Sequence, residues 1–76
     1  MAKVKKVTPV CYYEVQIDTE NEMPNFTINV SIDRNGDLHP VDEADYLIMQ
    51  TMKIEDKKLS QKLFADIRKQ IEGIPN

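Results

Sequence analysis

The feature that most constrains this fold is a strand followed at once by a tight turn. Across residues 26–33 apolar and polar residues alternate, which is the pattern of a strand that buries one face. Asn35-Gly36 follows, and it is the strongest short hairpin signal in the chain. A three-residue loop with Gly36 in the left-handed region would place Leu38 opposite Ile32, on the buried face. A two-residue turn would place Leu38 opposite an acidic residue, so the apolar match favours the longer loop.

A second alternating run covers residues 9–18. Its odd positions are Pro9, Cys11, Tyr13, Val15 and Ile17. This pattern predicts a strand with a buried odd face, and Pro9 would stand at its start, where a missing N–H is tolerated. Residues 19–25 are polar and should form a loop. Pro40 should end the third strand early, and the charged residues 1–6 lead into the first strand.

Asp42 marks the start of a helix. It is a good N-cap, and Asp45 occupies the third helical position. The apolar stripe of this helix consists of Ala44, Leu47, Ile48 and Met52. We expect this stripe to face the core.

A second helix is indicated by a break in that pattern. Residues 55–58 are charged, and Asp56 is placed to cap a new helix. Apolar residues then recur every four positions, at Leu59, Leu63, Ile67 and Ile71, with Phe64 broadening the face. Gly73 ends this helix. One long kinked helix is the alternative.

Together these elements predict an α+β fold. It is an antiparallel β-meander of two to three strands followed by two α-helices packed on one face of the sheet. With 76 residues the chain lies near the lower limit for one hydrophobic core. We therefore expect residues 1–76 to form a single domain.

Cysteine content indicates the cellular compartment. Cys11 is the only cysteine, so no disulfide can form within the chain, and a secreted domain this small would usually carry an even set. The first residues lack the apolar segment of a signal peptide. No apolar run approaches the roughly 20 residues of a membrane-spanning helix. We expect a cytoplasmic protein that has no contact with a membrane.

The formal net charge of −3 is distributed unevenly. Residues 14–56 hold eleven acidic residues against Arg34 and Lys53, whereas both ends of the chain are basic. The acidic block argues against nucleic acid as the ligand of that region, because phosphate binding depends on Lys and Arg. It permits attraction to a basic partner, and a solvated acidic surface is the alternative.

No catalytic, cofactor or metal site is predicted. With only two glycines the chain cannot form a glycine-rich phosphate loop. Residues 33–37 resemble the opening of an EF-hand calcium loop, but Leu38 and Ala44 stand where that loop needs Gly and Glu. His39 and Cys11 are the only His and Cys residues, too few for a zinc site within one chain.

Two sets of residues are candidates for binding a partner. The acidic set comprises Asp18, Glu20, Glu22, Asp42, Glu43 and Asp45, which should face solvent without basic partners in the chain. The second set comprises Tyr12, Met23 and Met49, which fall off the predicted core pattern and belong to residue types enriched at interfaces.

The function expected from these features is that of a small non-catalytic protein-interaction module. By analogy of size and charge, it would act like a phage or mobile-element inhibitor that presents an acidic surface to a basic, nucleic-acid-handling protein such as a host defence nuclease. The first alternative is a structural or assembly subunit, such as a homo-oligomer that uses a sheet edge or the helix pair. The second is nucleic-acid binding through the basic ends of the chain.

Overall fold

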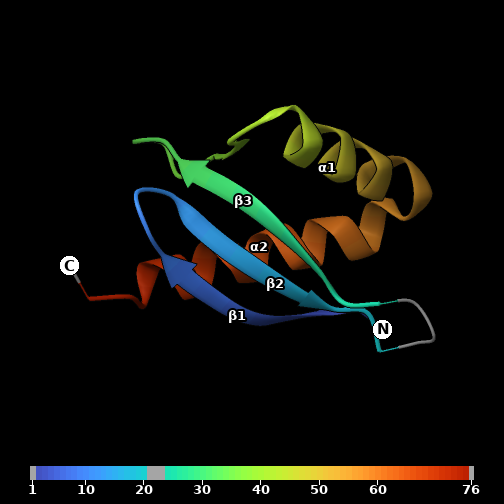
Figure 1. The fold of residues 1–76 in the computed structure, drawn as a ribbon, viewed down its shortest axis with the longest axis horizontal. Helices are drawn as coiled ribbons and strands as arrows, with labels where there is room; N and C mark the ends of the chain where they lie inside the picture. The colour runs from blue at the N-terminus through green and yellow to red at the C-terminus, as the bar shows by residue number, and fades with distance from the viewer. Residues whose placement is uncertain (1, 21–23, 76) are drawn as a thin grey trace.

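The computed structural model describes residues 2–20 and 24–75, which form a four-stranded antiparallel sheet and two helices (Figure 1). The strands lie in chain order in the sheet. The elements are β1 (Lys3–Pro9), β2 (Tyr13–Asp18), β3 (Phe26–Ile32), β4 (Leu38–Pro40), α1 (Glu43–Glu55) and α2 (Lys57–Glu72). The α+β class is confirmed, whereas the expected number of strands was too low.

The strand missing from the sequence prediction is β1. It pairs with β2 through Val4 opposite Ile17 and Val7 opposite Val15, and the register shifts between Val4 and Lys6. This β-bulge adds one residue, so two apolar residues three positions apart both reach the core side. A search for strict alternation cannot recognise such a strand.

The predicted strand over residues 9–18 is in fact divided by a turn. Pro9 ends β1 and pairs with Tyr13 at the start of β2. Within the turn, the Val10 N–H donates to the carbonyl of Tyr12 at 2.6 Å. Cys11 is exposed there, so the expectation that it is buried was wrong.

The β3–β4 hairpin has the predicted loop. Ile32 pairs with Leu38, and the Asp33 N–H donates to the Asp37 carbonyl at 3.0 Å. Gly36 has φ of +85°, the left-handed conformation that glycine adopts without a steric penalty. The three-residue loop is therefore confirmed.

Both helices begin at the predicted caps. Asp42 and Asp45 form a reciprocal capping box at α1, and the Asp56 carboxylate accepts the Leu59 N–H at 2.9 Å to start α2. Asp56 has extended backbone, which separates two helices and excludes the single kinked helix. Neither helix of the described chain has the length and apolar character needed to cross a bilayer.

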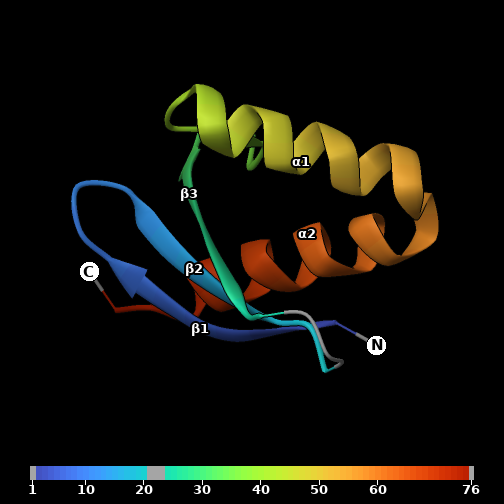
Figure 2. The same cartoon turned by 45° about the vertical axis from the view of Figure 1, so that its right-hand side comes forward.

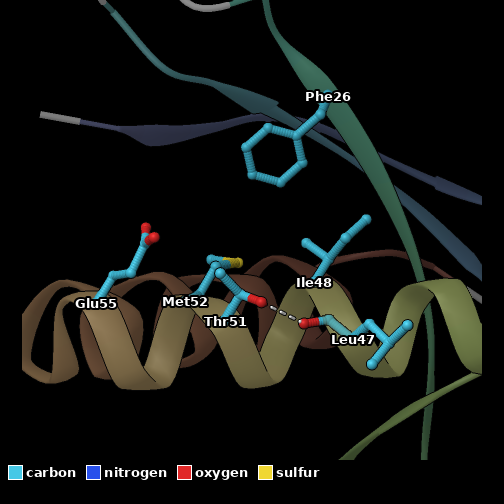
Figure 3. Close-up of a pocket in the computed structure, with 6 residues that line it drawn as sticks. All are labelled: Phe26, Leu47, Ile48, Thr51, Met52 and Glu55. Atoms are coloured by element: carbon cyan, nitrogen blue, oxygen red, sulfur yellow. Dashed lines mark hydrogen bonds between the residues drawn. The ribbon is translucent and has the colours of Figure 1, made fainter.

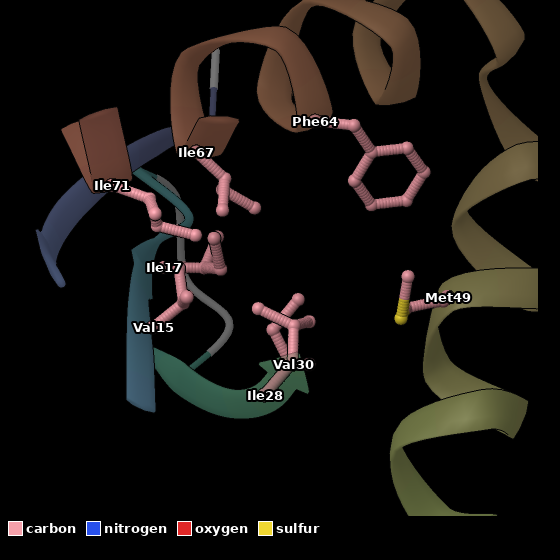
Figure 4. Close-up of a cluster of buried hydrophobic side chains, with 8 residues drawn as sticks. All are labelled: Val15, Ile17, Ile28, Val30, Met49, Phe64, Ile67 and Ile71. Atoms are coloured by element: carbon pink, nitrogen blue, oxygen red, sulfur yellow. The ribbon is translucent and has the colours of Figure 1, made fainter. Parts of the chain in front are cut away.

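The two helices lie as an antiparallel pair on one face of the sheet (Figure 2). Helix α2 packs along β1, and α1 packs beside β3 and β4. Between the layers lies a cluster of buried side chains: Val15, Ile17, Ile28, Val30, Met49, Phe64, Ile67 and Ile71 (Figure 4). Only one of these, Met49, comes from α1.

Candidate protein-interaction surface

Helix α1 carries more apolar side chains than the core buries; Met49 is in the core cluster, and Ile48 and Met52 pack against it. Seven of its thirteen residues are apolar: Ala44, Tyr46, Leu47, Ile48, Met49, Met52 and Ile54. Only Met49 among them is buried. Leu47 is 56% exposed and Ile54 is 82% exposed. By contrast, α2 buries four large apolar residues against the sheet.

The predicted apolar stripe of α1 faces the core only in part. Ala44 and Leu47 are exposed, and Ile48 and Met52 are only half-buried. The core side is occupied by Asp45 and Met49, each 4% exposed. The expectation was therefore wrong for Ala44 and Leu47, whereas Ile48 and Met52 pack against the core cluster. Ala44 and Leu47, together with Ile54, form an apolar stripe that α1 turns toward solvent.

An open groove of about 400 Å³ adjoins this stripe (Figure 3). Phe26 of β3 stands on one side, and on the other stand five α1 residues, Leu47, Ile48, Thr51, Met52 and Glu55. A second hollow of about 140 Å³ shares Phe26, Met52 and Glu55 and continues toward the start of α2. The stripe and the two hollows form one continuous surface, which we call the α1 face.

The polar groups of the α1 face lie in two positions. The Thr51 hydroxyl donates to the Leu47 carbonyl at 2.8 Å, so covering it leaves no hydrogen-bond donor without an acceptor. Glu55 stands at the end of the groove (Figure 3), and no ion pair involves it within residues 2–20 and 24–75. The α1 face is therefore an apolar surface with an acidic residue, Glu55, at one end.

Two of the predicted acidic binding residues hold α1 on the sheet instead. The buried Asp45 carboxylate accepts the N–H groups of Asn29 at 2.9 Å and Asp42 at 3.2 Å. Asp42 in turn accepts the Asp45 N–H at 3.0 Å, and this bond lowers the pKa of Asp42. The expectation that Asp45 faces solvent was wrong, while Glu43 beside it is exposed.

The other acidic candidates lie at the opposite end of the strands. Glu20 forms an ion pair of 2.8 Å with Lys3, and hydrogen bonding to Lys3 lowers the pKa of Glu20. The expectation that it lacks a basic partner was wrong. Asp18 accepts the Glu20 N–H at 3.0 Å, and Glu22 lies outside the described residues. The acidic candidates therefore form two separate groups. Asp18 follows Ile17, which pairs with Phe26 at the start of β3, whereas Asp45 bonds to Asn29 farther along β3.

The predicted aromatic and methionine set is not one surface patch. Met49 is buried in the core, so its assignment to the surface was wrong. Tyr12 is half-buried at the turn between β1 and β2. Met23 lies outside the described residues.

The calcium-like loop uses its carboxylate to close the hairpin. One oxygen of Asp33 accepts the N–H groups of Asn35 and Asp37 at 2.8 and 3.0 Å. The other lies 2.7 Å from His39 Nε2. These bonds, above all the one with His39, lower the pKa of Asp33. In the part of the chain that the structure describes, no three His, Cys, Asp or Glu residues are grouped to hold a metal ion.

Sequence reasoning named Leu47, Ile48 and Met52 but assigned them to the core, and it did not include Ile54. The available signal was the number of apolar residues on α1, which exceeds what one buried face can hold. No protein family, curated protein or solved structure matches this chain.

Proposed function

We propose that this chain is a non-catalytic protein-interaction module that binds its partner through the α1 face. The observation that carries the proposal is the exposure of a regular apolar stripe beside an open apolar groove. Large contiguous apolar surfaces on small domains mark binding sites, because leaving them in water is unfavourable.

The sheet edges support the helix layer as the contact surface. The edge strand β1 carries Lys3, Lys5 and a bulge, and lysines and bulges prevent a further strand from pairing with an edge. The opposite edge, β4, has three residues and ends at Pro40, which has no N–H to offer. Strand addition is therefore disfavoured at both edges.

A capture experiment tests the proposal. Ile54→Glu places a charge on the α1 face, and Val10→Glu is the matched control, because Val10 is also an exposed apolar residue, at 63%, on the β1–β2 turn. Tagged wild-type and variant chains are used to capture partners from cells of the native source. We expect Ile54→Glu to lose a partner that Val10→Glu keeps. Retention of every partner by Ile54→Glu would refute the proposal.

An acidic surface for a basic, nucleic-acid-handling protein is the second candidate, and inhibition is the corresponding activity. The exposed positions of Asp37, Glu43 and Glu55 support it. Attraction between exposed charges is screened within about 8 Å at physiological salt, so such binding should weaken as salt rises. Charge reversal at Glu43 and Glu55 should then slow association, and binding that ignores both changes would exclude this candidate.

A further inference from the structure

We infer that the partner of the α1 face is a second copy of this chain, with the two α1 helices antiparallel across a two-fold axis. This inference rests on the proposed function and names the occupant of its surface. It also covers Ala44, Leu47 and Ile54, the α1 apolar residues of this row that the chain's own core leaves exposed.

The order of residue sizes along the stripe is self-complementary. Ala44, Leu47, Thr51 and Ile54 follow one another at spacings of three or four, so they lie in one row on the helix surface. Small and large side chains alternate in this row. In an antiparallel pair, Leu47 of one copy packs over Thr51 of the other, and Ile54 packs over Ala44. Each large side chain thereby meets a small one, which is how close-packed interfaces fill space.

The one polar side chain of the row, Thr51, does not oppose this arrangement. The Thr51 hydroxyl already donates to the Leu47 carbonyl, so covering it leaves no donor without an acceptor. The same patch serves both copies, which is the condition for a closed two-fold dimer.

Helix dipoles favour the antiparallel direction over the parallel one, because the positive start of each helix then lies beside the negative end of the other. Side-chain charges do not select a direction. In the antiparallel register the exposed Glu43 of one copy stands opposite Glu55 of the other, with Lys53, Lys57 and Lys58 close to Glu55 in the chain, whereas a parallel pair would set Glu43 against Glu43.

Sedimentation velocity of the purified chain, from about 1 µM to about 1 mM, tests the inference. We expect a monomer–dimer equilibrium. Ala44→Glu places a charge where Ile54 of the other copy should pack. Ala65→Glu is the matched control, because Ala65 is likewise an exposed helical alanine, on α2. We expect Ala44→Glu to raise the dimer dissociation constant at least tenfold, and Ala65→Glu to leave it within about threefold.

A second variant guards against a folding defect. Ile54→Ser should weaken the dimer at least tenfold while the circular dichroism spectrum of the monomer stays that of the wild type. A monomeric wild type over the whole range overturns the inference, as does a dimer that survives both Ala44→Glu and Ile54→Ser. Open-ended assembly in place of a dimer overturns the two-fold arrangement. If the wild type is monomeric yet Ile54→Glu loses a captured partner, the inference fails and the proposed function stands.

Discussion

Asp45 shows how one side chain can decide which face of a helix is buried. Its carboxylate bonds to the N–H of Asn29 in β3 and to the N–H of its own cap, Asp42. These bonds require it to face the sheet, so Met49, one turn later, faces the sheet as well. Leu47 and Ile54 then have to face away from it. A buried carboxylate thus determines the exposure of the apolar stripe.

Replacement of Asp45 by alanine tests this role. Two backbone N–H groups lose their acceptor in Asp45→Ala, and the expected loss in the free energy of unfolding is about 1–3 kcal/mol. Glu43→Ala is the control, because it removes an exposed carboxylate from the same turn. Urea unfolding of both variants gives the comparison. Equal losses would show that Asp45 does not hold α1 to β3.

Acid should weaken the β3–β4 hairpin through Asp33. Hydrogen bonds to His39 and to the hairpin backbone lower its pKa in the folded state below the ordinary value of 3.8. A lowered pKa stabilises the fold at pH above the ordinary value, and this contribution is lost as pH falls through the lowered value. Asp33→Asn should therefore be less stable than wild type at pH 7, and the difference should vanish at the lowest pH. A difference that is independent of pH would contradict this assignment.

At the scale of elements, turns and helix ends could be predicted wherever one residue type strongly favours one backbone conformation. Asn35-Gly36, the caps Asp42 and Asp56, and Gly73 were all read correctly. The strand β1 could not be predicted, because its bulge at Lys5 breaks the alternation. The turn at residues 10–12 has no Gly or Asn, and Cys11 continued the apolar alternation of β2 by chance.

The two glycines offer a matched test of the hairpin. Gly36 has φ of +85°, and a Cβ at this position would meet no other atom within 4 Å, so an alanine there encounters only backbone strain. We expect Gly36→Ala to cost about 1–2 kcal/mol. Gly73→Ala is the control, since Gly73 has right-handed helical backbone with φ of −79°. Thermal unfolding measures both, and an equal effect of the two substitutions would argue against the left-handed loop.

At the scale of the molecule, the buried core comes mainly from the sheet and α2, while α1 places Met49 in it and packs Ile48 and Met52 against it. The regular spacing of Leu63, Ile67 and Ile71 identified the buried face of α2 correctly. On α1 the apolar residues surround most of the helix, so their spacing alone could not identify the buried face. That choice depends on the long-range bond between Asp45 and Asn29, which no local pattern reveals.

Two isoleucine truncations should separate the core from the α1 face. Ile28 is fully buried, and Ile28→Ala should cost about 2–5 kcal/mol of folding free energy. Ile54 is 82% exposed, and Ile54→Ala should change the stability of the monomer by less than about 0.5 kcal/mol. Unfolding at low protein concentration keeps association out of the comparison. A large loss with Ile54→Ala would place that side chain in the core and remove it from the binding surface.

The central claim is that the α1 face is the contact surface between two copies of the chain, and backbone amide shifts of the ¹⁵N-labelled chain test it most directly. As the protein concentration rises, the amide signals of residues 44–55 and of Phe26 should shift or broaden together. The signals of Val10 and of β1 should stay constant and serve as the internal control. Concentration-dependent changes confined to the sheet edges or to the loop after Asp18, with residues 44–55 unchanged, would contradict the claim.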